Sequence, residues 1–163
     1  MAKKKFSYSK LAQQLPDIMS FSLNQLGNKI NKAIQDGVQS GKDINGAKFA
    51  PLSPVSKKLR KKGGPPLNVT GNMRQTKKIP ATKKKHSFII KMDAKKGKNK
   101  RKVQYGAYHN QGYTNSPNSA FPGTKVPKRE WFGIPKNMKP PNGKEFNKFV
   151  ETFEAKIKRA VEL

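Results

Sequence analysis

The sequence has no cysteine and few acidic residues, and both shortages limit what the protein can be. Without cysteine, the 163-residue chain cannot form disulfides, thiolate zinc sites or a cysteine nucleophile. Its two histidines, His86 and His109, are too few for the usual zinc ligand sets. Its nine carboxylates are scattered, with no close pair of the kind that holds catalytic metal ions. We therefore expect no catalytic residues, no metal, no cofactor and no enzyme.

Long apolar runs are missing as well. No stretch of about 20 apolar residues is present that could span a membrane. The basic start is not followed by the apolar core of about 7 to 15 residues that a signal peptide needs. Only 33% of the residues are hydrophobic, so the core should be small and much of the chain should be loop. We predict a single domain over residues 1–163, with a basic N-terminal arm over 1–8 and no membrane partner.

Positive charge is what the sequence has in excess. Lysine and arginine number 36 against 9 acidic residues, which gives a formal net charge of +27. Repulsion on this scale disfavours a compact monomer unless salt or an anionic partner screens it. We therefore expect a nucleic acid or an acidic protein surface as a partner. For any single lysine run the alternative stays open that it only solvates an exposed face.

The basic residues gather in three clusters, within residues 57–62, 83–85 and 95–102. Such clusters attract phosphate through counterion release, and they lack the side-chain arrangement that reads base edges. Any contact with DNA is therefore expected to be independent of sequence. The candidate contacts to DNA or to an acidic partner are Lys57, Lys58, Arg60, Lys61, Lys62, Lys83, Lys84, Lys85, Lys95, Lys96, Lys98, Lys100, Arg101 and Lys102.

The N-terminal region has the periodicity of one long helix. Between residues 9 and 40, apolar residues recur at steps of three and four and form one stripe. Either Phe21 or Ser22 occupies the stripe where the pattern is ambiguous. Pro16 fits a first turn or a break after a short lead-in, and Gly37 and Gly41 mark the exit. The pattern predicts an amphipathic helix over 9–40.

A second amphipathic helix is predicted over residues 142–163. Asn142 can cap it, with Glu145 three residues later. An aromatic stripe at helical spacing indicates core packing or a subunit contact rather than a cofactor site. The apolar face is made of Phe146, Phe149, Val150, Phe153, Ile157, Ala160 and Val161.

Residues 76–109 have the two-residue period of strands. The segments His86–Met92 and Lys102–His109 are predicted to pair as an antiparallel hairpin, whose tip would present the basic cluster 95–102. Thr76–Ile79 adds an edge strand. The stretches 41–75 and 110–141 are rich in turn residues and are predicted to be loops.

Four short segments, taken in order, are more specific than composition. They are Gly46-Ala-Lys-Phe-Ala-Pro-Leu-Ser-Pro54, Pro66-Leu-Asn-Val-Thr-Gly-Asn-Met-Arg74, Tyr105-Gly-Ala-Tyr-His-Asn-Gln-Gly112 and Val126-Pro-Lys-Arg-Glu-Trp-Phe-Gly-Ile134. Together with a long helix before them and an amphipathic helix after them, they resemble the phage virion morphogenesis family, the tail-completion proteins of Mu-like and P2-like phages. Phe49 stands where that family usually has tryptophan.

The resemblance implies an α+β fold. In it a long N-terminal helix and a C-terminal amphipathic helix pack against a small antiparallel β-sheet, with long basic loops. It also implies a structural virion protein of a tailed bacteriophage, assembled in the host cytoplasm and located in the tail or neck, where it completes the tail or joins it to the head.

The partners implied are further copies of the chain in a ring, other neck, connector and tail-tube proteins, and genomic DNA in the lumen without sequence preference. Tail symmetry suggests six copies, which would carry about 160 positive charges. An acidic neighbouring ring or DNA in the lumen is then expected.

Seven residues in these segments are predicted to anchor either the core or a subunit interface. Trp131 and Phe132 are the largest, and both interpretations stay open for them. Tyr105, His109 and Arg129 are expected to join a strand end to a loop, with Arg129 in a structural role. The full set is Phe49, Leu52, Tyr105, His109, Arg129, Trp131 and Phe132.

Two other functions remain as alternatives. The lysine runs fit a general basic nucleic-acid-binding protein of ribosomal or nucleoid type, although that class does not explain the four ordered segments. A small phage nuclease would require metal-dependent cleavage that is abolished by loss of one carboxylate. Formation of a closed ring separates the structural protein from the first alternative.

Overall fold

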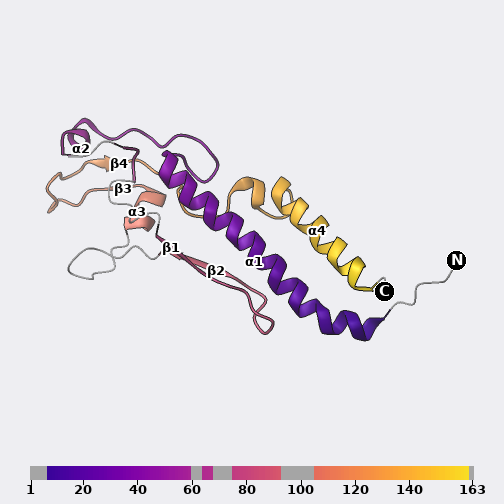
Figure 1. Cartoon of the computed structure of the whole chain (residues 1–163). Helices are drawn as coiled ribbons and strands as arrows, with labels where there is room; N and C mark the ends of the chain where they lie inside the picture. The colour runs from indigo at the N-terminus through magenta and orange to yellow at the C-terminus, as the bar shows by residue number, and fades with distance from the viewer. Residues whose placement is uncertain (1–6, 60–63, 68–74, 93–104, 162–163) are drawn as a thin grey trace. The chain divides into compact units, whose positions relative to one another are not determined.

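The computed structural model describes residues 7–59, 64–67, 75–92 and 105–161. These contain α-helices and two separate two-stranded sheets, so the predicted α+β class is confirmed (Figure 1). The chain divides into two compact units. The first comprises residues 1–31, 78–91 and 136–163, and the second comprises residues 32–77 and 92–135. The assignment of 1–163 to a single domain stays a prediction.

Helix α1 (Tyr8–Ser40) matches the predicted 9–40 helix almost to the residue. Pro16 lies inside it without ending it, so a break at that point is ruled out. The ambiguity in the apolar stripe is resolved in favour of Ser22, which is 2% exposed, whereas Phe21 is 55% exposed. The buried stripe thus contains one polar side chain.

Glycine ends α1 through a Schellman motif. Gly41 has a φ of 71°, its amide donates to Val38 O at 3.4 Å, and the amide of Lys42 donates to Gly37 O at 2.8 Å. These bonds satisfy carbonyls that the helix itself leaves unpaired. The exit predicted at Gly41 is therefore confirmed, whereas Gly37, also predicted to mark the exit, lies inside the helix.

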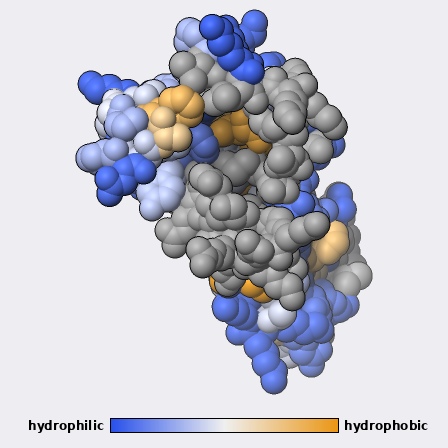
Figure 2. Space-filling model, turned by 90° about the vertical axis from the view of Figure 1, so that its left-hand side faces the viewer, coloured by the Kyte–Doolittle hydropathy of each residue, from blue (hydrophilic) through white to orange (hydrophobic). Residues whose placement is uncertain are grey.

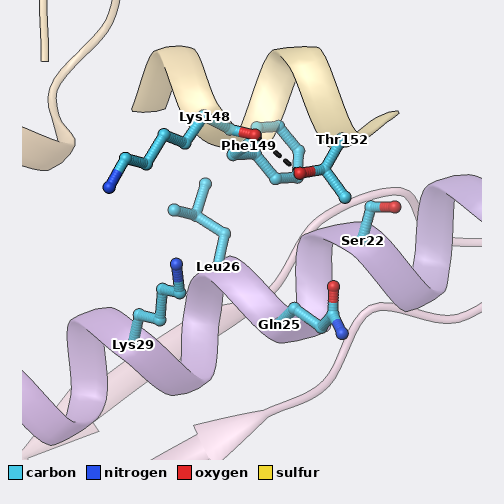
Figure 3. A pocket seen from close by; sticks show the side chains of 7 residues that line it. All are labelled: Ser22, Gln25, Leu26, Lys29, Lys148, Phe149 and Thr152. Carbon is cyan, nitrogen blue, oxygen red and sulfur yellow. Dashed lines mark hydrogen bonds between the residues drawn. The ribbon is translucent and has the colours of Figure 1, made fainter. Parts of the chain in front are cut away.

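In the first unit, helix α4 (Lys144–Val161) packs antiparallel against α1 (Figure 1). Leu26 of α1 and Phe149 of α4 point toward one another between the helices, beside a cavity of about 200 Å³ (Figure 3). The buried Ser22 hydroxyl lines the same cavity and has no hydrogen-bond partner among the described residues. Contact along one stripe of each helix is what their periodicity predicted.

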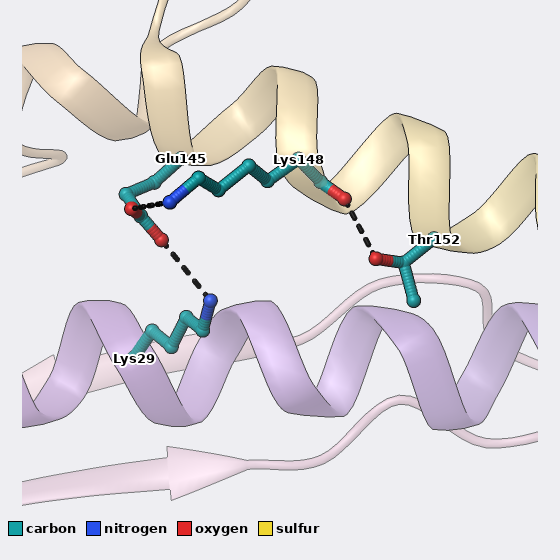
Figure 4. A network of polar contacts seen from close by, with 4 residues as sticks. All are labelled: Lys29, Glu145, Lys148 and Thr152. Carbon is teal, nitrogen blue, oxygen red and sulfur yellow. Dashed lines mark hydrogen bonds and ion pairs between the residues drawn. The ribbon is translucent and has the colours of Figure 1, made fainter.

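A small ion-pair network joins the same two helices. Lys29 of α1 lies 3.1 Å from one carboxylate oxygen of Glu145, and Lys148 lies 3.4 Å from the other (Figure 4). The hydrogen bond from Lys29, followed by that from Lys148, lowers the pKa of the Glu145 carboxyl below its usual value. The network links α4 to α1 but adds little stability, because exposed ion pairs contribute only about 0–1 kcal/mol.

The start of α4 differs from the prediction. The helix begins at Lys144 rather than at Asn142, directly after Gly143. A Cβ at Gly143 would lie 2.6 Å from Asn137 O, so the backbone approaches too closely there for any other residue. The three-residue 3₁₀ helix η2 (Lys136–Met138) supplies that neighbouring backbone. The apolar face of α4 is only half-buried, apart from Ala160.

Strands β1 (Thr76–Ile79) and β2 (Ile89–Met92) pair with each other. The predicted edge strand 76–79 is confirmed, and the predicted strand 86–92 is confirmed for its second half. Phe88 and Ile90 are half-buried while Ile89 and Lys91 are exposed, which is the expected alternation.

The segment between these strands docks on the face of α1 opposite to the one that α4 covers. The side-chain amide of Asn24 donates to Ala81 O and accepts from the amide of Ala81, both at 2.9 Å. Phe88 lies so close to Gly27 that a Cβ there would be 2.9 Å from its ring. The side-chain amide of Asn24 thus pairs with the backbone of Ala81 through two hydrogen bonds, as the backbones of neighbouring strands do.

The predicted strand Lys102–His109 is wrong where the structure describes it, because residues 105–111 form the helix α3 (Tyr105–Gln111). The predicted partner of β2 is therefore replaced by β1. Tyr105, Tyr108 and His109 are spaced by three and four as well as by alternation, so a short run allowed both interpretations. The predicted hairpin tip 93–101 lies outside the described residues.

The predicted loops 41–75 and 110–141 also contain regular structure, all of it short. Helix α2 (Pro54–Leu59) begins at a proline, which suits the first helical position. Strands β3 (Tyr113–Thr114) and β4 (Lys125–Val126) pair antiparallel, Tyr113 with Val126 and Thr114 with Lys125. Two-residue strands are too short to show a period, so the sequence pattern could not reveal them.

The core of the second unit forms around the last turns of α1. Ile34 and Val38 are 1% and 0% exposed, and Trp131 is 1% exposed. Phe49 belongs to the same unit and is 8% exposed. These side chains come from three separate stretches of sequence, so the core holds the otherwise irregular loops in place.

We predict that Gly41→Ala destabilises the protein more than Gly46→Ala does. Both glycines have positive φ, at 71° and 91°, which costs any other residue about 1–2 kcal/mol. A Cβ at Gly41 would also lie 2.6 Å from Cβ of Pro65, whereas at Gly46 it would meet nothing within 4 Å. Urea unfolding of both variants measures the difference, and equal losses would contradict a role for the contact with Pro65.

Candidate functional site

A buried arginine organises the second unit. Arg129 is 4% exposed, and its guanidinium donates to backbone carbonyls on two loops. Nε and Nη2 donate to Ala50 O at 3.2 and 3.1 Å, and Nη2 also donates to Pro51 O at 3.2 Å. Nη1 donates to Pro127 O at 3.4 Å. A buried charge is tolerated when polar atoms surround it in this way, and the planar fork of arginine reaches several acceptors at once.

The backbone around Arg129 is tied to two further segments. Its own amide donates to His109 O at 2.8 Å, and the amide of Phe132 donates to the side chain of Asn110 at 3.1 Å. Glu130 O accepts from the amide of Ile44 at 2.8 Å. We call this set of contacts the Arg129 junction.

The Arg129 junction brings together three of the four motif segments, 46–54, 105–112 and 126–134. The fourth, 66–74, is described only at Pro66 and Leu67. Gly112 is needed where two of these segments touch, since its φ is 75° and a Cβ would lie 2.9 Å from Lys128 N. The motif residues therefore hold loops together, which fits the structural role expected for Arg129.

The other predicted anchors lie around this junction. Trp131 is fully buried and its ring lies 5.4 Å from that of half-buried Phe132. Phe49 is buried in the same unit, and Leu52 lines a cavity there. Tyr105 lies in α3, and its side chain is outside what the structure describes. Within one chain, then, Trp131 and Phe49 are core residues.

His109 is the one described histidine in a protected position. Its ring lies 5.8 Å from that of Tyr113, in an edge-on arrangement. Its Nδ1 is buried and has no hydrogen-bond partner among the described residues. Burial first, and the charge of Arg129 second, lower the pKa of His109 below 6.5. The ring is therefore neutral at pH 7, which a neighbouring guanidinium favours.

A cavity of about 260 Å³ opens beside the junction, and we call it the hairpin cavity because the β3–β4 hairpin forms one side of it. Most of its walls are apolar, and they come from Leu52, Tyr113, Phe121, Val126 and Pro127. Its charged groups are Arg129 and Lys125, and none of the described residues that line it carries a carboxylate.

Sequence patterns did not indicate the hairpin cavity, because its lining comes from four stretches of chain that meet only in the fold. Asn110, which holds Phe132, was also missed. The Tyr-Thr and Lys-Val pairs that flank the turn residues of 115–123 were a weak signal of the hairpin.

Of the predicted basic contacts, the structure describes Lys57 and Lys58 on α2 and Lys83, Lys84 and Lys85 between β1 and β2. All five are exposed. Lys83 is paired with Asp17 at 2.8 Å. The other predicted contacts lie outside the described residues; they are Arg60, Lys61, Lys62, Lys95, Lys96, Lys98, Lys100, Arg101 and Lys102. Figure 2 shows a largely hydrophilic described surface on the face that it views, with small hydrophobic patches.

The described residues offer neither a metal site nor a membrane span. Within residues 7–59, 64–67, 75–92 and 105–161, no three His, Asp or Glu side chains are grouped so that they could bind a metal ion. No helix in these ranges is both long and apolar enough to cross a bilayer.

A sequence profile of the phage virion morphogenesis family matches residues 6–140. The match covers most of the chain and includes all four motif segments and the Arg129 junction. The chain belongs to the phage virion morphogenesis family. No curated protein and no solved structure matches it.

Membership confirms the resemblance that the motif segments indicated. A protein of the phage virion morphogenesis family is a virion-associated structural protein of a bacteriophage, and the family is not known for enzymatic activity. The match ends at residue 140, so α4 lies outside the matched range.

We predict that acidification weakens the fold through His109. The unfolded chain takes up a proton near pH 6.5, whereas the folded chain resists it until lower pH. The unfolded state therefore binds more protons below pH 6.5, and the free energy of unfolding falls as the pH falls through this window. Urea unfolding between about pH 7.5 and about pH 5.5 measures the slope.

His109→Asn should reduce that slope, even if it lowers stability at every pH. His86→Asn changes the exposed histidine and is the matched control. An unchanged slope in His109→Asn would contradict the assignment.

Proposed function

We propose that this virion protein is a tail-completion or neck component that forms a ring at the head-proximal end of the tail and joins it to the head. The observation that carries the proposal is the family match over 6–140, together with the meeting of three of its motif segments at the Arg129 junction. A junction that fixes loop geometry suits a protein that works through contacts with other chains.

The charge of the chain supports a position beside a polyanion. A net charge of +27 repels other copies of the same chain unless anions lie close by. DNA passing through a ring, or an acidic neighbouring ring, would supply them. In this proposal the exposed lysines of 57–58 and 83–85, with the remaining basic residues of 60–62 and 95–102, face that partner.

Ring formation distinguishes this function from that of a general nucleic-acid-binding protein. At moderate salt, light scattering coupled to sizing should give the mass of a closed oligomer, for which six copies are expected, and negative-stain images should show rings. A monomer or dimer under these conditions would favour the nucleic-acid-binding alternative.

Loss of the protein from the phage tests its position. Infection with a phage that carries a stop codon early in the gene should yield filled heads and tails that are not joined, visible by electron microscopy. Supplying the protein from a plasmid should restore joined particles. Complete infectious particles without the protein would rule the proposed function out.

We predict that binding to unrelated DNA duplexes weakens steeply as salt rises. Each phosphate contact contributes about −0.9 to the slope of log affinity against log salt. The double variant Lys84→Ala/Lys85→Ala should therefore reduce the steepness by about 2. Lys139→Ala/Lys144→Ala removes the same charge from exposed positions outside the clusters and is the control. A flat salt response of the natural protein would remove DNA as the partner.

A further inference from the structure

The charged residues that line the hairpin cavity are positive, which determines the charge of the group that it can bind. Arg129 lies buried at one wall and Lys125 lies on β4, and none of the described lining residues is acidic. A carboxylate near these two cations is stabilised, whereas an ammonium group is repelled. The electrostatics therefore favour an acidic occupant.

The shape of the cavity restricts the occupant further. A volume of about 260 Å³ lies below the range of about 300–1,000 Å³ that is usual for cofactor sites. It has room for one or two side chains. Because Leu52, Phe121 and Val126 contribute apolar walls, the complementary surface combines a carboxylate with an apolar side chain.

Of the seven acidic residues that the structure describes, four have partners within the chain. Asp17 pairs with Lys83, and Glu130 pairs with Lys128. Glu145 pairs with Lys29 and Lys148. The carboxylate of Asp43 accepts two amides of its own loop, at 2.8 and 2.9 Å. These carboxylates are engaged in holding the fold.

Of the remaining three, Asp36 lies on α1, whereas Glu151 and Glu154 lie together on α4. Both are exposed, and neither forms an ion pair or a hydrogen bond within the described part of the chain. They lie three residues apart, so they are neighbours on one side of the helix. Glu154 is also a helix neighbour of half-buried Val150 and Ile157. This side of α4, which we call the acidic face, combines carboxylates with apolar side chains.

We propose that the acidic face of α4 of one copy docks in the hairpin cavity of the next copy. In this contact Glu154 meets the positive charge of Lys125 and Arg129, and Val150 meets the apolar wall. The proposal rests on the ring proposed above, because a contact between two different surfaces closes into a ring when repeated. Between copies that each carry a net charge of +27, most pairs of surfaces repel, and the contact that joins them needs the few available carboxylates.

A charge exchange tests the contact. Lys125→Glu alone and Glu154→Lys alone should each weaken assembly by about tenfold or more, measured by sizing and light scattering over a range of protein concentrations. Combining both substitutions in one chain restores the natural net charge and should recover most of the assembly. Lys139→Glu and Asp36→Lys make the same charge changes at other exposed positions and should leave assembly unchanged.

Cross-linking provides a second measurement that does not depend on charge. Because the chain has no cysteine, Lys125→Cys combined with Glu154→Cys introduces the only thiols. Mild oxidation should then give a ladder of covalent oligomers on a non-reducing gel, up to the full ring. Either cysteine alone should give no species beyond a dimer.

The outcomes separate this inference from the proposed function. If both single charge-reversal variants still form the ring, the proposed contact is wrong although the ring stands. The same holds if the two cysteines form a disulfide only within one chain. The absence of any ring in the natural protein would overturn both.

Discussion

The second unit depends on a buried guanidinium whose partners are backbone carbonyl oxygens. Removing a charge from water is costly unless polar atoms surround it, so the loops that present Ala50, Pro51 and Pro127 carbonyls must hold one conformation. Two of these acceptors belong to prolines, whose fixed φ limits the directions in which the carbonyl can point. A short, largely irregular unit thereby obtains a defined shape from few residues, and Trp131 packs into the core close to the arginine.

The first unit is organised differently, around two opposite faces of one helix. Leu26 and its neighbours face α4, and Asn24 and Gly27 face the segment around Ala81 and Phe88. Apolar contact holds one side, and a paired amide with a tight glycine contact holds the other. Ser22 and the cavity beside it show that packing between α1 and α4 is incomplete, in keeping with a C-terminal helix whose apolar face stays half-exposed.

The sequence was most informative where a pattern extends over many residues. Thirty residues of helical period predicted α1 to within one residue, and the start of α4 was missed by two because Gly143 contacts backbone far from it in the pattern. Residues 105–109 were assigned to a strand because five residues fit both the helical and the strand period. The hydrogen bond from the Arg129 amide to His109 O joins residues 20 positions apart, so no local pattern could predict it. Arg129 and Trp131 were found only through the family motif, whereas the hairpin cavity has no counterpart in sequence at all.

In a chain this basic, the carboxylates carry more information than the lysines. An exposed ion pair contributes only about 0–1 kcal/mol, so Asp17 with Lys83 and Glu145 with Lys29 add little to stability. They link α4 and the segment between β1 and β2 to α1. In the proposed ring, like charges would exclude most approaches between copies, and the rare acidic positions would define the approaches that remain. Glu151 and Glu154, which form no ion pair within the described residues, would serve assembly in that ring, whereas Asp17, Glu130 and Glu145 form ion pairs within the fold.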